Sequence, residues 1–194
     1  MKKQLFIALT LIIFTITGFA QQKLPTLNIN SSEIIEKAQE MDFSEAKEIL
    51  LTIPLGDTLY NTAQMMLGKL HTNNKQYEDA LKYCMWVLEH PNSKVSEKDI
   101  IPTMAECYYY LNDYNTAIFY FNKALEYFPY KAYLHNNLAQ CYMQLEMTTK
   151  AEEHLILAIR CEPFNNSFHY QLALTYLKQR QTIPALLALN FSSY

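Results

Sequence analysis

At 194 residues the chain is long enough for one folded domain with a short tail. Its formal charge of −3 argues against a nucleic-acid binder, which needs a basic stripe to neutralise phosphates. Half of the residues are hydrophobic and 13% are aromatic, while only 3 are glycine, so the composition favours packed helices over a β-sandwich with many tight turns.

The first twenty residues form a unit of their own. Lys2 and Lys3 precede an apolar run that extends from Leu5 to Phe19, and a small residue, Ala20, follows it. The run has about fifteen residues, fewer than the ~20 that span a bilayer. Residues 1–20 are therefore interpreted as a cleavable signal peptide, with an uncleaved signal anchor as the alternative. Both interpretations predict export, and the periplasm or cell envelope of a diderm bacterium is the expected location. Membrane contact is expected only through this segment before cleavage, and residues 21–30 are interpreted as a linker.

Five alanines mark an internal repeat. Ala46, Ala80, Ala117, Ala151 and Ala185 are separated by 34, 37, 34 and 34 residues. A period of this length is typical of stacked helix pairs, in which each pair covers the apolar face of the next. Residues 95–97 are interpreted as an insertion. The predicted repeats are residues 27–60, 61–94, 98–131, 132–165 and 166–194.

Each clear unit contains two amphipathic segments joined by a short polar turn. In residues 98–131, for example, Met104 and Tyr108 recur at helical spacing on the first segment. Pro129 closes this unit, because proline cannot extend the helix that precedes it. Pro102 lies near the start of its helix, and a helix capped by Asp99 is predicted to place it in the tolerated first turn.

The two terminal units depart from this pattern. Residues 27–60 keep only the second helix clearly, with Phe43, Ala46 and Leu50 on its apolar face, so this unit is interpreted as a weak N-terminal capping repeat. Residues 166–194 form a truncated unit, so no following helix covers the helix at 185–191. The uncovered helix at 185–191 is expected to be covered by a partner, by self-association or by sequence missing from a shortened chain.

The 34-residue spacing, with small residues such as Gly68 and Ala105, aromatic residues such as Tyr77 and a closing proline at fixed places, resembles the tetratricopeptide repeat family. The resemblance covers residues 61–194 well and 27–60 weakly. It implies an all-α fold, a right-handed superhelical solenoid of antiparallel helix hairpins with about four to four and a half repeats. It also implies that the first helix of each unit lines a concave groove.

Carried over to this chain, the family's groove is rich in tyrosine and side-chain amides. Amides both donate and accept hydrogen bonds, so they can pair with the backbone of an extended peptide, and tyrosine offers a broad contact face with a polar tip. The resemblance thus implies a protein or peptide partner. The predicted lining residues are Met65, Met66, Lys69, Thr72, Thr103, Glu106, Tyr109, Tyr110, Tyr133, Asn137, Gln140, Met143, Gln144, Ser167, Tyr170, Gln171, Leu174 and Lys178.

The sequence carries no pattern of catalytic, cofactor-binding or metal-binding residues. The five histidines are scattered, although His135 and His169 share one place in neighbouring units. Cys107 and Cys141 lie one period apart, where stacked helices stand ~8–10 Å from each other, too far for a disulfide. These cysteines are interpreted as small buried fillers.

The leading hypothesis is a non-enzymatic adaptor or scaffold that binds a peptide or protein segment in its concave groove within the cell envelope. One alternative is a structural or assembly factor of an outer-membrane complex. The other is a regulatory segment of a longer sensor or enzyme. No cofactor, metal or nucleic acid is expected under the leading hypothesis.

Overall fold

The computed structural model describes residues 30–192, so the predicted signal peptide at 1–20 and all but the last residue of the linker at 21–30 lie outside the described residues. Within 30–192 the chain forms ten α-helices and no strand, as the sequence predicts. The helices are α2 (Ser31–Ala38), α3 (Phe43–Leu50), α4 (Tyr60–Asn73), α5 (Tyr77–Glu89), α6 (Glu97–Tyr110), α7 (Tyr114–Tyr127), α8 (Ala132–Gln144), α9 (Thr148–Cys161), α10 (Asn166–Lys178) and α11 (Thr182–Ser192).

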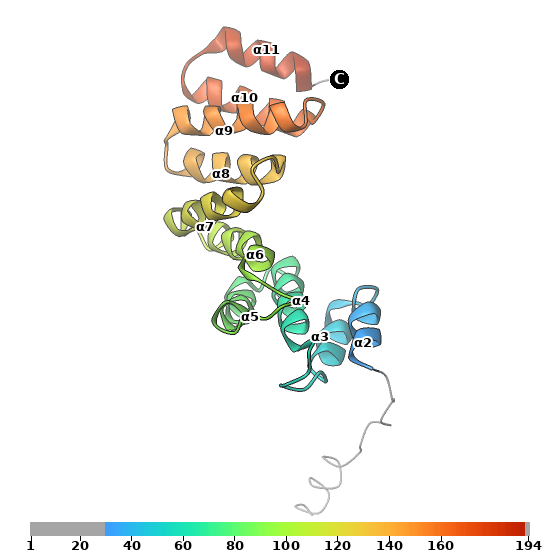
Figure 1. Cartoon of the computed structure of the whole chain (residues 1–194). Coiled ribbons are helices and arrows are strands. Elements are labelled where there is room, and N and C mark those ends of the chain that lie inside the picture. The colour runs from blue at the N-terminus through green and yellow to red at the C-terminus, as the bar shows by residue number, and fades with distance from the viewer. Residues whose placement is uncertain (1–29, 193–194) are drawn as a thin grey trace, which may run out of the picture.

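The helices form five hairpins that stack in chain order, from α2 and α3 at one end to α10 and α11 at the other (Figure 1). Each helix contacts the next one along the chain, and α4 also contacts α6, as α6 contacts α8. The apolar core is accordingly a row of neighbouring clusters along the stack. The largest cluster joins α6 to α11 and contains the fully buried Phe121, Leu134 and Leu138. Stability in such a stack comes from each hairpin and its interfaces with its neighbours.

Small side chains let the two helices of a hairpin approach closely, as the period of alanines predicts. The period alanines from Ala46 to Ala185 are all completely buried. On the first helices, Ala105 and Ala139 are also fully buried, and at Gly68 an added Cβ would lie 2.8 Å from the Cys84 sulfur. A contact this short leaves no room for a methyl group, so this hairpin depends on glycine for its closest approach.

The turn inside each of the last four hairpins has the same backbone geometry. One residue in each turn adopts the left-handed conformation, with φ between 59° and 63°. The next residue donates its N–H to the carbonyl five residues before it, which satisfies an end carbonyl of the first helix. In each of these four hairpins the turn directs the second helix antiparallel to the first. The left-handed residues are Lys75, Asn112, Glu146 and Arg180.

The N-terminal unit has both helices where the sequence shows only the second clearly, and the predicted Asp99 cap of α6 is wrong. Residues 27–60 contain a complete hairpin, because Ile34 and Ala38 give α2 a short buried stripe and the Asn30 side chain caps its start by accepting from the Glu33 N–H. Residues 95–97, interpreted as an insertion, are not all in a loop, because Glu97 is already helical. Helix α6 begins at Glu97 after the Ser96 cap, whose N–H donates to Asp99.

The earlier start of α6 places Pro102 in its second turn instead of its first. Proline has no N–H, so the carbonyl of Lys98, four residues before it, lacks its usual helical partner. Lys98 and Pro102 both line a depression between the repeats, so the exception in the helix lies at the surface where a partner could use the freed acceptor.

Candidate functional site

The first helices of successive repeats lie side by side and are joined by polar contacts. The Tyr109 hydroxyl on α6 donates to Gln140 Oε1 on α8 at 3.0 Å. The Thr175 hydroxyl on α10 lies 3.3 Å from the Met143 sulfur on α8. These contacts hold α6, α8 and α10 in register, so side chains one period apart face a common surface. We call this surface, formed by α4, α6, α8 and α10, the first-helix face.

The first depression on the first-helix face has a volume of about 430 Å³. It brings together four of the predicted groove residues, Lys69 from α4, Thr103 and Glu106 from α6, and Tyr133 from α8. Burial raises the pKa of the Glu106 carboxyl above its usual value, and the nearby Lys69 ammonium opposes that shift. The depression therefore offers a partly desolvated carboxyl group beside an aromatic ring.

Five further residues line this depression, and sequence reasoning missed them. Lys98 and Pro102 precede Glu106 at intervals of four residues, so helical spacing alone could have assigned them to the same face. The same spacing relates Lys69 to Asn73. The missed residues are Asn73, Lys98, Asp99, Pro102 and Phe128.

The second depression lies between α8 and α10 and has a volume of about 610 Å³. Four predicted residues with polar heads meet there, together with the apolar Met143, Leu174 and Leu177. Lys178 Nζ donates to the carbonyl of Met143 at 3.4 Å. The amides offer donors and acceptors above an apolar floor, which suits a peptide backbone better than a small charged ligand. The four polar residues are Gln140, Gln144, Gln171 and Lys178.

Four other predicted groove residues do not line either depression. Met65 packs against the core cluster of α5 and α6. Tyr110 stacks on Tyr77 at a centroid distance of 4.8 Å, next to a turn. The Asn137 side chain accepts from Asn136, and Tyr170 is about half exposed. Their part in binding a partner stays a prediction.

Three more of the predicted lining residues are also placed elsewhere. Met66 packs against the core cluster formed by α2, α3 and α4. The Thr72 hydroxyl is buried, where it donates to the Gly68 carbonyl and lies 3.2 Å from the Cys107 sulfur. Ser167 lies in the first turn of α10, beside the loop that follows α9. Threonine or serine at groove spacing therefore does not by itself identify a lining residue.

The repeated histidines have a structural role. Nε2 of His135 donates to the carbonyl of Pro129 at 3.0 Å, and Nε2 of His169 donates to that of Pro163 at 2.8 Å. Each histidine thus ties its first helix to the loop that closes the preceding unit. No group of three potential metal-ligating side chains occurs in the part of the chain that the structure describes.

The cysteines that the sequence predicts to be buried are buried in the structure. Cys107 and Cys141 are completely buried, and the four thiols are unpaired in the structure. Burial raises the pKa of Cys141 to about 12, so the thiol is held in its neutral, weakly nucleophilic form.

A helix that crosses a bilayer needs about 20 predominantly apolar residues. Between residues 30 and 192, none combines the length and the hydropathy that a membrane-crossing helix needs.

Comparisons with known proteins agree with the repeat geometry. A family model described as tetratricopeptide repeat matches residues 108–175. A comparison with curated proteins gave no match. Among solved structures, MamA from Desulfovibrio magneticus RS-1 is 16% identical with a TM-score of 0.75, and the alignment covers 84% of this chain and 90% of that chain. MamA MSR-1 is also 16% identical, with a TM-score of 0.69 and coverage of 84% and 91%.

At this identity the likeness to MamA shows a shared fold and nothing beyond it. The family model rests on the sequence itself and spans the unit whose helices are α8 and α9 together with parts of both neighbouring units. The same units carry the alanine period and the repeated left-handed turns. On these grounds, residues 108–175 match the tetratricopeptide repeat family, and the hairpins on either side continue the same fold.

Proposed function

We propose that the chain is a non-enzymatic adaptor whose first-helix face binds an extended segment of another protein. A tetratricopeptide repeat scaffold supports interaction with a protein partner in general. The observation that carries the finer proposal is the pair of neighbouring depressions on one face, the first with Glu106 and Tyr133, the second with Gln140 and Gln171. The Tyr109 to Gln140 hydrogen bond connects them, so one chain segment could contact both.

We also propose that the adaptor is exported to the periplasm or cell envelope. The support is the pattern of residues 1–20, with its two lysines, its apolar run and the small residue after it. Fractionation of the producing cells, with detection by an antibody against residues 98–165, tests the location. Recovery in the cytoplasmic fraction would contradict it.

The partner-binding proposal can be tested by site-specific photo-crosslinking in the producing cells. A benzophenone amino acid in place of Tyr133 lies at the first depression, whereas the same group in place of Phe119 lies on the exposed side of α7, a second helix. We expect a discrete crosslinked protein from position 133 and not from position 119. Equal crosslinking from both positions would favour a structural strut, and no product from position 133 would contradict the proposal.

The paired substitution Gln140→Ala and Gln171→Ala then measures how much the amides contribute. We expect the purified partner to bind about tenfold more weakly, because each amide that loses its backbone contact removes roughly 0.5–1.5 kcal/mol. Isothermal titration calorimetry gives the affinity. The matched control is Tyr127→Ala, a partly exposed side chain on a second helix, which should leave affinity unchanged.

A further inference from the structure

Three of the repeats contain the same pair of contacting aromatic rings, which is stacked in two of them and tilted by 37° for His71 and Tyr83. One ring comes from the end of the first helix, and the other lies twelve residues later on the second helix. The centroid distances are 5.1 Å for His71 and Tyr83, 5.4 Å for Tyr108 and Tyr120, and 5.6 Å for Tyr142 and His154. Stacked rings at these distances stabilise the contact beyond the area that they bury. The pairs therefore form a regular column along the side of the stack.

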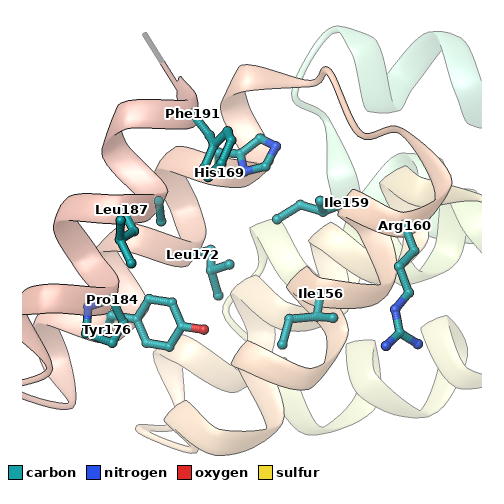
Figure 2. Close-up of a pocket in the computed structure, with 10 residues that line it drawn as sticks. Ile156, Ile159, Arg160, His169, Leu172, Tyr176, Pro184, Leu187 and Phe191 are labelled. Atoms are coloured by element: carbon teal, nitrogen blue, oxygen red, sulfur yellow. The ribbon is translucent and has the colours of Figure 1, made fainter. Parts of the chain in front are cut away.

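The last repeat keeps one ring of the pair and lacks the other. Tyr176 occupies the first place, but Ala188 stands twelve residues later, where the preceding repeat has His154. A cavity of about 340 Å³ opens there between α9, α10 and α11. Figure 2 shows Tyr176 and Leu172 of α10 at its base, with Leu187 of α11 and Ile156 of α9 on opposite sides.

The helix beside the cavity differs from its counterpart in a second way. Residues Pro184, Leu187 and Phe191 form an apolar strip on α11, and Leu187 and Phe191 are 59% and 63% exposed. One period earlier, Lys150 and Glu153 stand at the places of Pro184 and Leu187. The preceding repeat thus presents charges to water at two of these three places, while Leu157 stands at the place of Phe191. The strip forms one wall of the cavity and runs about 10 Å along α11, a length that suits contact with a polypeptide segment.

The rim of the cavity carries a positive charge. Arg160 on α9 lines the cavity and is exposed, and the three ion pairs found between residues 30 and 192 do not include it. A guanidinium group at an apolar rim attracts a carboxylate, and it can hold one by two parallel hydrogen bonds. The Glu152 carboxylate interacts with Tyr176 on another side of the cavity, so charge complementarity favours a partner carboxylate beside Arg160.

We propose that this cavity binds an aromatic side chain from an acidic segment of a partner protein. The ring takes the place that Tyr83, Tyr120 and His154 hold in their own repeats, and it stacks on Tyr176. A neighbouring carboxylate of the same segment pairs with Arg160. The site lies between α9, α10 and α11 and uses other residues of α10 than the second depression does, so the adaptor has a second binding surface.

Labelled peptides test this proposal directly. Three fluorescein-labelled nonapeptides have a central phenylalanine, leucine or alanine between pairs of glutamates, and a fourth has lysines in place of the glutamates around phenylalanine. We expect the acidic phenylalanine peptide to bind the full chain with a dissociation constant of about 0.1 mM, measured by fluorescence anisotropy. The alanine and lysine peptides should bind at least about tenfold more weakly.

The substitution Ala188→Tyr supplies the missing ring from within the chain. Because the new ring fills a cavity and stacks on Tyr176, we expect it to raise Tm by about 3 °C. The same ring occupies the proposed site, so the phenylalanine peptide should bind more than about tenfold more weakly. The control Ile183→Tyr adds the same side chain at an exposed position of α11 outside the cavity, and it should leave binding unchanged. Arg160→Gln should weaken the binding of the acidic phenylalanine peptide and should not weaken the binding of the lysine peptide.

Several outcomes would overturn the proposal. They are equal binding of all four peptides, unchanged binding by Ala188→Tyr, and no anisotropy change up to about 1 mM peptide. Sedimentation equilibrium separates a further occupant, a second copy of this chain at helix 185–191. A dimer that Ala188→Tyr dissociates, without peptide binding, would assign the cavity to self-association and overturn the peptide proposal. Gln140→Ala and Gln171→Ala should not alter peptide binding, so failure here leaves the first-helix face untouched.

Discussion

Replacing Phe121 with alanine is expected to remove about 3–5 kcal/mol from the free energy of unfolding. Phe121 is completely buried in the cluster that joins α6 and α7 to α8, where it packs among residues including Ala105, Leu134 and Leu138. Deleting the ring loses its transfer energy and leaves a cavity, because helices held by their neighbours collapse only partly. Urea unfolding followed by circular dichroism measures the change.

The position of Phe121 gives this variant a second expected effect. Each hairpin contacts mainly its neighbours, so weakening one central interface should separate the unfolding of the two ends. We expect one broad transition for the parent chain and two resolved transitions for the variant, with faster amide exchange in α6 and α7.

Phe119→Ala is the matched control for Phe121→Ala. Phe119 lies on the same helix with 60% of its surface exposed, so its removal should change the free energy of unfolding by less than about 0.5 kcal/mol. Equal midpoints for the two variants would contradict the placement of the core.

The helix hairpins were predictable because their signals are local and repeat. Ala46 to Ala185 mark the close contacts of each hairpin, and Pro129 and Pro163 stand just after helices that end at Tyr127 and Cys161. Helix α2 was not predictable in this way, since its eight residues bury only Ile34 and Ala38. Two buried positions are too few to establish a helical period without the neighbour against which they pack.

The candidate site was predictable only in part, because it depends on distances between helices. Family spacing placed Lys69, Glu106 and Tyr133 on one face, and the structure brings them to one depression. The same spacing could not show that Tyr110 stacks on Tyr77. Rotamer choice near a turn decides such contacts, and a sequence period does not determine it.

The cavity at the last repeat left a signal in the sequence that becomes readable with the structure. The ring column shows that the places of Tyr83, Tyr120 and His154 matter, and Ala188 then stands out as the exception. The sequence alone predicted an uncovered helix at 185–191 and could not assign a ring to the missing place. The ring contacts in the structure identify the place of Ala188 as the one that lacks a ring.

Acidification from pH 7 to pH 5 is expected to destabilise the chain through the buried His71 and the partly buried His154. The pKa of His154 is lowered to about 4, mainly by burial and in part by the nearby His135 and Lys150. Burial also lowers the pKa of His71, which lies between the rings of Phe43 and Tyr83. Both histidines stay neutral in the folded chain at a pH where the unfolded chain takes up their protons.

The sign of the effect follows from proton uptake. The unfolded state binds protons at the usual histidine pKa of 6.5, whereas folded His154 resists protonation until about pH 4. Stability is therefore complete above about pH 6.5 and falls as the pH decreases toward 4. For His154 the loss at pH 5 is about 2 kcal/mol, from 1.36 kcal/mol per pKa unit over the interval below 6.5.

The contact between His154 and His135 makes the first of these histidines a specific target. Nε2 of His135 donates to Pro129, so its Nδ1 carries a lone pair and accepts from Nδ1 of His154 at 3.2 Å. His154→Phe keeps a ring against Tyr142 and removes the group that titrates. We expect this variant to lose markedly less stability between pH 7 and pH 5 than the parent chain, as measured by urea midpoints at each pH.

Other groups also titrate in this interval, so the difference between variants decides the result. Burial raises the pKa of Glu106, which gives it the opposite effect, since its folded carboxyl takes up a proton first as the pH falls. That contribution is the same in the parent chain and in His154→Phe, so it cancels. His90→Phe is the matched control, because His90 is exposed and stacks on Trp86 at 4.3 Å, and it should keep the full loss. If both variants lose as much stability as the parent chain, burial of His154 does not govern its acid sensitivity.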